Sequence, residues 1–241
     1  MKRVVITGIG AVTAFGKTWE DVKAAFQRKQ NAVQAKTEWA ERYPELGANL
    51  GAEIHDYTPP AHWNRKQLRS LGRVSQFAVE AAELALANAN LLDENGVILP
   101  YLKEGIMGVA CGSSTGSTND VRDAAELLMT GKSDGFNANT YVRMMPHTTA
   151  ANIGITGRII PTSSACSSGS QGIGYAYESI KHGLIPMMLA GGAEEFCPSE
   201  VYVFDSLYAA SRNNAHPKQT PRPYDKDRDG LVIGEGAGIF V

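Results

Sequence analysis

Residues 161–170 read PTSSACSSGS, and this stretch decides the fold because a strand is expected to end just before its cysteine and a helix to begin just after it. The pattern places Cys166 on a strand-to-helix turn. Unpaired backbone N–H groups and the positive end of a helix dipole favour a thiolate at such a turn. Cys166 is therefore the predicted nucleophile, whereas the ordinary role of a free cysteine, a small buried apolar group, is expected for Cys111 and Cys197.

Composition indicates one large globular domain, since 43% of the 241 residues are hydrophobic and 20% are charged. Three cysteines without close pairing favour neither a disulfide framework nor a zinc ribbon and suit the cytoplasm. A net charge of −2 provides no global field for nucleic acid, so a charged partner would need a local patch. No stretch is long enough to span a membrane, and the apolar run after Arg3 is interpreted as a buried strand rather than a signal peptide.

Strand and helix patterns alternate along the chain, which predicts an α/β fold with a mostly parallel sheet. Strands are expected near 3–9, 105–111, 159–165 and 186–192, with a last one in 231–241. Helices are expected near 18–29, within 64–91 and near 118–130, 147–156 and 167–182. Thr18 with Asp21 is expected to cap the first helix, and Gly183 to end the last. The small residues of the helix after Cys166 predict that it is buried between layers.

Several familiar motifs fail on spacing. Gly10–Thr18 resembles a phosphate-binding loop, but five residues rather than four separate its glycines. No histidine has the spacing of a metal site, so no metal is expected. His147 and His216 remain possible bases for Cys166, because members of a catalytic triad can be distant in sequence. The apolar end at Ile239–Val241 suggests a cut through a larger protein, with later residues completing the sheet and the active site.

Four segments in fixed order carry a family resemblance: RVVITGIG at 3–10, SACSSG at 164–169, AGGAE at 190–194, and RPYDKDRDG at 222–230 followed by GEGAG at 234–238. With them the chain resembles the N-terminal half of a β-ketoacyl-acyl carrier protein synthase, a condensing enzyme of the thiolase-like superfamily, closest to the elongating synthases of type II fatty acid synthesis. The resemblance implies a layered α-β-α-β-α fold of two similar halves. Residues 1–241 would be one N-terminal synthase domain with a mixed, mostly parallel five-stranded sheet, and the C-terminal half would be absent.

The resemblance makes Cys166 the residue that accepts an acyl group from acyl carrier protein as a thioester. Malonyl-carrier protein then loses carbon dioxide, and its carbanion attacks the thioester to give a β-ketoacyl product. The Cys166 N–H is expected to be one oxyanion donor. The second donor and the two histidines of the family belong to segments absent here, so this chain alone is expected to lack a complete site. The resemblance implies a cytoplasmic homodimer without cofactor.

The resemblance also implies substrate and partner sites. Related synthases line the acyl chain with the loop matching Gly112–Gly116, which contains Thr115, and with the segment matching Met144 and Met145. Thr115 departs from the expected apolar residue or glycine: either it hydrogen-bonds a turn or its hydroxyl disfavours a saturated tail.

Carrier proteins are acidic, which calls for a local basic patch. Arg65, Lys66, Arg69 and Arg73 recur at helical spacing, and Lys66 and Arg69 match docking positions of the family. Arg212 is a further docking residue by this interpretation, and a solvated helix face is the alternative for the run.

Two other functions stay open. The first is a non-catalytic partner subunit that sets chain length, against which Cys166 argues because such subunits typically lack the nucleophile. The second is a thiolase or another acyltransferase of the same fold, against which the signature in 222–238 argues.

Overall fold

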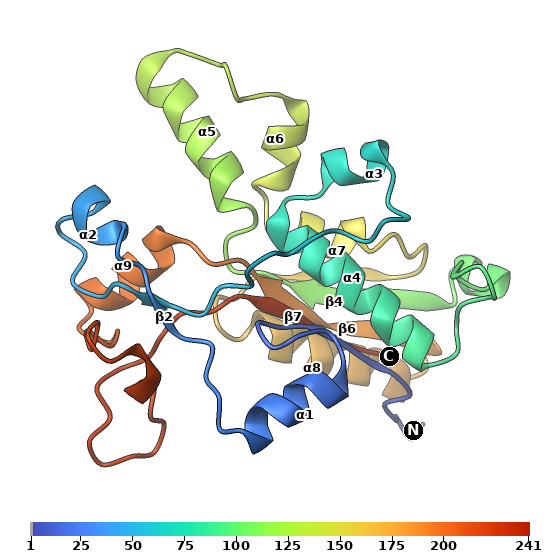
Figure 1. The fold of residues 1–241 in the computed structure, drawn as a ribbon. Coiled ribbons are helices and arrows are strands. Elements are labelled where there is room, and N and C mark those ends of the chain that lie inside the picture. The colour runs from blue at the N-terminus through green and yellow to red at the C-terminus, as the bar shows by residue number, and fades with distance from the viewer. Residues whose placement is uncertain (1) are drawn as a thin grey trace. The chain divides into compact units, whose positions relative to one another are not determined.

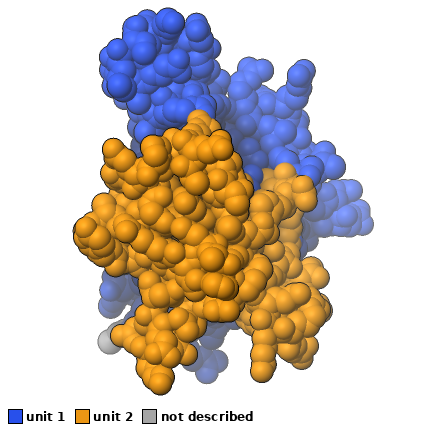
Figure 2. Space-filling view, turned by 60° about the vertical axis from the view of Figure 1, so that its left-hand side comes forward, with its two compact units in different colours: residues 1–12, 58–195, 236–241 blue, residues 13–57, 196–235 orange. Residues whose placement is uncertain are grey.

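The computed structural model describes residues 2–241 (Figure 1), which divide into two compact units (Figure 2). Among the described residues, the first unit comprises 2–12, Thr58–Glu195 and Gly236–Val241, and the second comprises Thr13–Tyr57 and Phe196–Glu235. Within residues 2–241, every helix is too short or too polar to cross a lipid bilayer.

The first unit is built around a five-stranded sheet of order β1-β7-β6-β4-β5. Its strands are β1 (Ile9–Val12), β4 (Met107–Gly112), β5 (Ile159–Thr162), β6 (Met187–Glu194) and β7 (Gly236–Phe240). Its helices are α3 (Arg65–Ser70), α4 (Arg73–Asn88), α5 (Thr118–Thr130), α6 (Ala138–Arg143), α7 (Thr148–Asn152) and α8 (Ser168–Lys181), with a 3-10 turn η1 (Pro100–Lys103).

Strand directions confirm the predicted mixed sheet. The β4 strand pairs in parallel with both β5 and β6, whereas β7 is antiparallel to both β6 and β1. Four strands therefore run in one direction and β7 alone opposes them. All six residues of β4 are buried, as expected for a central strand covered on both faces.

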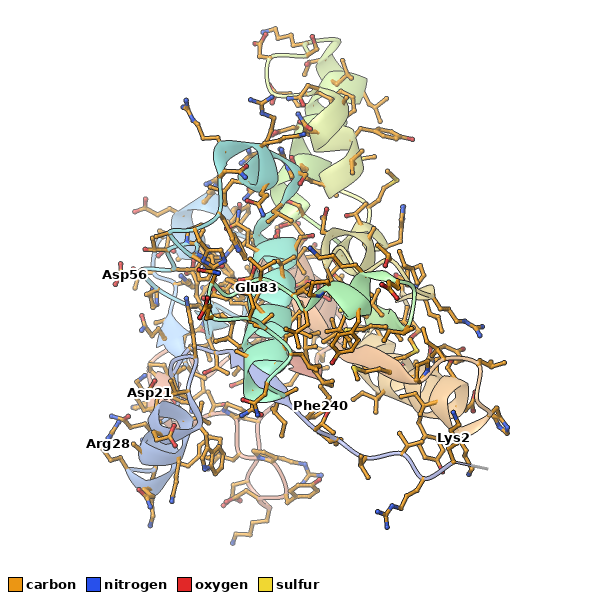
Figure 3. The ribbon with its side chains drawn as sticks, turned by 90° about the vertical axis from the view of Figure 1, so that its right-hand side faces the viewer. Lys2, Asp21, Arg28, Asp56, Glu83 and Phe240 are labelled. Carbon is orange, nitrogen blue, oxygen red and sulfur yellow. The ribbon has the colours of Figure 1, made fainter. Side chains whose placement is uncertain are left out.

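Helices cover both faces of this sheet (Figure 1). The α4 helix packs on β1 and β7, and the approach is so close that a Cβ at Gly10 would lie 2.1 Å from the carbonyl oxygen of Ala81. Figure 3 labels Glu83 on α4 and Phe240 on β7, the two packed elements. The opposite face carries α8, which contacts β4, β5 and β6. The sheet is thus the middle of three layers.

The second unit contains α1 (Trp19–Gln27), β2 (Gln34–Ala35), α2 (Trp39–Arg42), β3 (Leu50–Gly51), α9 (Pro198–Ser206) and the 3-10 turn η2 (Pro217–Gln219). Its core centres on Trp39, which stacks on Phe196 with ring centroids 5.2 Å apart. The Thr18 hydroxyl accepts from the Asp21 N–H, which confirms the predicted cap of α1. Asp229 accepts from the hydroxyls of Ser211 and Thr220, so it orders the charged 222–230 loop.

Several sequence-based boundaries are wrong. The first strand begins at Ile9 rather than near residue 3, because its register pairs Ile9 with Phe240, the last residue of β7. The residues before Ile9 make separate backbone bonds to Val241 and Lys181 instead of a continuous strand pairing. The helix expected within 64–91 is broken before Gly72, which precedes α4. The last strand covers only Gly236–Phe240 of the predicted 231–241.

Burial of α8 also differs from the prediction. Gly172, Ala176 and Ser179 are buried beneath the sheet, but Ile173 and Tyr177 are exposed on the other side of the helix. The small residues of α8 therefore allow a close contact with the sheet on one side of the helix, and no second layer covers its other side within residues 2–241. A Cβ at Gly172 would lie 2.7 Å from the Ala110 carbonyl oxygen, so glycine is required on the sheet-facing side only.

Candidate active site

Cys166 lies on the turn between β5 and α8, as predicted, and its side chain is exposed. The strand ends at Thr162 and the helix begins at Ser168. Between them Ala165 takes φ 53°, a left-handed conformation that a residue with a Cβ rarely adopts. The turn therefore holds the thiol at the carboxyl end of a parallel strand and beside the first turn of a helix.

Hydroxyl groups hold this turn in its left-handed shape. The Ser168 hydroxyl accepts from the Ser164 N–H at 2.9 Å and donates to the Ala165 carbonyl oxygen at 2.7 Å. The Thr162 hydroxyl donates to the Ser168 carbonyl oxygen at 2.9 Å. Ser167 adds a donated bond of 2.8 Å to the Ser164 carbonyl oxygen from an exposed position. These bonds offset the cost of the left-handed residue beside Cys166.

Two glycines allow close backbone contacts around the Cys166 turn. A Cβ at Gly192 of β6 would lie 3.0 Å from the Cα of Gly169 in the first turn of the helix. A Cβ at Gly112 would lie 1.7 Å from the Thr162 carbonyl oxygen, which only glycine permits at the end of β4. Both contacts leave the backbone around Cys166 little room to shift.

Three strand ends meet beside the Cys166 turn. The register pairs Gly112 of β4 with Thr162 of β5 on one side and with Gly192 of β6 on the other. The loop after β4, residues 113–117, and the acidic pair Glu194 and Glu195 therefore lie at the same edge of the sheet as Cys166. Ligand sites of α/β sheets form at this carboxyl edge.

The predicted acyl-chain residues come together at this loop. Gly116 has φ 68°, and a Cβ there would lie 2.6 Å from the carbonyl oxygen of Met144. The Ser117 N–H donates to the Arg143 carbonyl oxygen at 3.1 Å, which fastens the loop to the end of α6. The structure thus places Gly116, the residue that follows Thr115, against the Met144–Met145 segment.

The Thr115 hydroxyl is engaged within the protein. It lies 3.3 Å from a carboxylate oxygen of Glu194 and 3.4 Å from the Gly116 carbonyl oxygen. Of the two roles expected for Thr115, these contacts favour the first, in which its hydroxyl forms a hydrogen bond within the loop. A hydroxyl satisfied in this way presents less of a penalty to an apolar tail.

The acidic pair at the end of β6 binds both ends of the 113–118 segment. Glu194 accepts from the Ser113 hydroxyl at 2.7 Å and from the Ser114 N–H at 2.6 Å. Glu195 accepts from the Thr118 N–H at 2.7 Å and hydroxyl at 2.5 Å. Burial raises the pKa of Glu195 despite these bonds, and the charge of Glu194 adds to the increase.

The four predicted docking cations separate into different settings. Lys66 and Arg69 are exposed on α3, whose start is fixed by a capping box between Asn64 and Gln67. Arg73 belongs to α4, and its guanidinium lies 4.9 Å from the ring centroid of Phe77. The exposed run is therefore confined to α3, which also presents Arg65.

Arg212 lies in the second unit and pairs with a buried acid. Its Nε donates to Asp205 at 2.7 Å, and Asp205 also accepts from the Gly47 N–H at 2.8 Å. Burial alone would raise the pKa of Asp205, but these bonds hold it below its usual value. Arg212 thus stabilises its own unit, although half of its side chain stays exposed.

The remaining cysteines and histidines occupy other surroundings. Cys111 and Cys197 are buried, as predicted, and burial raises the pKa of the Cys111 thiol to about 12. His147 precedes α7, and the His216 ring lies 3.3 Å from Asn213 in the second unit. Within residues 2–241, no hydrogen bond joins a histidine to Cys166, and no cluster of acidic, cysteine or histidine side chains forms a metal site.

Sequence reasoning missed three residues that shape this site: Ser168, Glu195 and the role of Glu194. Ser168 carried a local signal, because a serine at the first helical position can bond the preceding turn. Glu195 followed directly after a recognised segment, and its burial beside a second acid had no local signature. Its partner Thr118 is 77 residues away in sequence.

Comparisons with known proteins agree with this geometry. A crystal structure of a β-ketoacyl synthase from Burkholderia phymatum superposes with a TM-score of 0.94 at 49% identity, covering 100% of this chain and 58% of that one. A family model, the N-terminal domain of β-ketoacyl synthases, matches residues 1–241. The chain therefore belongs to the β-ketoacyl synthase family.

Two further relatives broaden the family context. The 3-oxoacyl-[acyl-carrier-protein] synthase 2 of Synechocystis is 31% identical over 245 residues, which cover 100% of this chain and 57% of the relative. A solved structure titled "The ishigamide ketosynthase/chain length factor" gives a TM-score of 0.77 at 26% identity, covering 98% of this chain and 57% of that one. The chain thus spans about half the length of the relatives it matches.

Proposed function

We propose that this chain is the nucleophile-bearing half of a 3-oxoacyl-[acyl-carrier-protein] synthase. In the first half-reaction the Cys166 sulfur attacks the carbonyl carbon of an acyl-carrier thioester. The new thioester forms as the carrier's thiol leaves with the proton of Cys166. In the second, malonyl-carrier protein loses carbon dioxide, and the resulting carbanion forms a carbon–carbon bond to the acyl group while the Cys166 thiolate leaves.

One observation carries this proposal: an exposed cysteine on a rigid turn at the carboxyl edge of three parallel strands, at the start of a helix of fourteen residues. An acyl carrier can reach such an exposed thiol. The left-handed turn with its serine bonds keeps the sulfur in one place during attack. The Cys166 N–H serves as one oxyanion donor.

The proposed acyl-chain site comprises Thr115, Met144 and Met145. The contact between Gly116 and Met144 supports it, because it joins the two segments beside the Cys166 turn. Methionine side chains are flexible and apolar, so they suit a channel that accommodates alkyl chains. Thr115 contributes mainly through its bond to Glu194.

The proposed partner is an acidic acyl carrier protein that binds the exposed cations of α3. Lys66 and Arg69 carry this part of the proposal, because both are exposed on one short capped helix. Arg73 and Arg212 contribute less, since each is held by contacts of its own. Opposite charges would steer the carrier to this surface and weaken its binding as salt increases.

The complete site requires more than these residues. No histidine bonds Cys166 within residues 2–241, and the outer side of α8 exposes Ile173, Tyr175 and Tyr177. Apolar side chains on the outer side of a helix suit a covering layer. We infer that residues 1–241 act as an N-terminal domain completed by a second half, in a cytoplasmic homodimer that uses no metal or organic cofactor.

Mass spectrometry tests this function directly. The chain, and a version extended by any natural sequence that follows Val241, would be mixed with short-, medium- and long-chain acyl-carrier thioesters. Intact mass would report acylation, and peptide mapping would locate it. Cys166→Ala is the matched control, and the buried Cys111 and Cys197 serve as internal references.

An acyl mass on Cys166 that disappears in Cys166→Ala would support the transferase half-reaction. Condensation in the extended protein but not in the short chain would support an incomplete site. If no version gained an acyl mass while Cys166 reacted no faster with iodoacetamide than Cys111 and Cys197, the synthase proposal would fail. The non-catalytic chain-length subunit would then be the better assignment.

A further inference from the structure

Two adjacent carboxylates at the end of β6, Glu194 and Glu195, accept hydrogen bonds from the two ends of the 113–118 segment. Glu194 binds its first half, accepting from the Ser113 hydroxyl at 2.7 Å and the Ser114 N–H at 2.6 Å, with the Thr115 hydroxyl at 3.3 Å. Three donors from three consecutive residues meet one side chain. A charged acceptor forms stronger bonds than a neutral one, so this carboxylate is a strong anchor for the loop.

Glu195 binds the other end of the same segment. It accepts from the N–H and hydroxyl of Thr118 at the start of α5 and, at 3.2 Å, from the Val74 N–H in the first turn of α4. Its side chain is buried, and its partners are parts of the scaffold. Glu195 thus supports the packing of helices, whereas Glu194 holds a loop that reaches the site.

A bond inside the loop connects Glu194 to Gly116. Ser113 is buried, and its hydroxyl also accepts from the Gly116 N–H at 3.1 Å, so the hydroxyl links Glu194 to the left-handed glycine. That glycine is in contact with Met144. Loss of the Glu194 carboxylate would therefore allow Ser113 and Gly116 to move, and with them the contact between Gly116 and Met144.

We propose that Glu194 is a positioning residue that fixes the 113–116 loop against Met144 beside Cys166 and thereby sets the length of acyl chain that the site accepts. This inference rests on the proposed function. The register of β4, β5 and β6 places the loop and Cys166 at one edge of the sheet, so the loop forms a wall next to the acylated sulfur. A wall held in one position discriminates between chains by length, whereas a mobile wall does not.

The test compares Glu194→Ala, Glu194→Gln and Ser113→Ala, with the exposed Glu94→Ala as the control. The protein would include any natural sequence that follows Val241. Glutamine can keep the loop in place, because its amide oxygen accepts from Ser114 while its NH₂ group donates to the Ser113 oxygen. Alanine leaves the donors of the loop without this partner.

Three measurements separate positioning from general damage. Hydrogen exchange of the Ser114 amide should accelerate about tenfold or more in Glu194→Ala and stay within about threefold in Glu194→Gln. The ratio of Cys166 acylation rates with long and short acyl carriers should shift about tenfold in Glu194→Ala and Ser113→Ala. Alkylation of Cys166 by iodoacetamide should be unchanged, because the Ser168 bonds remain intact.

Faster exchange together with a changed chain-length ratio, rescued by glutamine, supports the proposal. Unchanged exchange in Glu194→Ala overturns it, since the loop would then be fixed by other contacts. Faster exchange with an unchanged ratio also overturns it, because the loop would not select the chain. If the unaltered protein showed no acylation of Cys166 with any chain, the proposed function itself would fall, and the chain-length assignment with it.

Discussion

Replacing Ser168 by alanine removes the hydroxyl that holds the turn before α8. That hydroxyl accepts from the Ser164 N–H and donates to the Ala165 carbonyl oxygen, and the serine is buried. Alanine has nearly the same volume as serine and a higher helix propensity, so the loss of the two bonds is the main destabilising effect. The left-handed Ala165 then loses the contacts that compensate its strained backbone.

The expected cost follows from the number of bonds. Each contributes about 1 kcal/mol net, so the turn should lose about 2 kcal/mol of stabilisation. The left-handed conformation of Ala165 costs about 1–2 kcal/mol, which favours relaxation of the turn once the bonds are gone. If Cys166 reacts only from the ordered turn, its acylation rate should fall about 10- to 30-fold, since 1.4 kcal/mol corresponds to a factor of ten.

The assay measures the rate of Cys166 modification by an acyl-carrier thioester, with iodoacetamide as a small reagent that needs no docking. Ser167→Ala is the matched control, because its hydroxyl also bonds the Ser164 carbonyl oxygen, at 2.8 Å, but is exposed and replaceable by water. Urea unfolding would detect general instability. Equal rates for Ser168→Ala and the unaltered protein, or equal losses for Ser168→Ala and Ser167→Ala, would refute the reasoning.

Three other changes test separate parts of the structure. Asp205→Asn should destabilise the protein by about 2 kcal/mol at neutral pH. Because folding lowers the pKa of Asp205, the carboxylate stabilises the protein above the usual aspartate pKa of 3.8, and this stabilisation is lost as the pH falls through the lowered pKa. The urea midpoints of the variant and the unaltered protein should therefore converge in acid. Folding raises the pKa of Glu195, so the free energy of unfolding should decrease as the pH rises from the usual glutamate pKa of 4.5 through the raised pKa. A series of urea titrations at different pH values should show this decrease in the unaltered protein and not in Glu195→Gln. Combined Lys66→Glu and Arg69→Glu should weaken carrier binding about tenfold or more at low salt and less at high salt, measured by fluorescence titration, whereas equal binding at all salt concentrations would exclude α3 as the docking surface.

Local patterns predicted the centre of the fold well. The β4 and α8 elements occur close to their expected ranges, and α5 covers the predicted 118–130. These elements have strong local signals: an apolar strand run, a serine–glycine turn and a left-handed Gly131 that ends α5. The predictions failed where pairing rather than propensity decided, as in the residues before β1, whose partner strand ends at Phe240.

By itself, the sequence determined that a strand leads into a turn with Cys166 and then into a helix, and which family the chain resembles. Both depend on short segments whose residue types encode their own conformation. Only the tertiary structure decided that Glu194 holds Ser113, which is 81 residues away, that Arg73 lies on a different helix from Lys66 and Arg69, and that Arg212 binds Asp205. Contacts between distant segments depend on sheet register and helix packing, which local residue preferences do not specify.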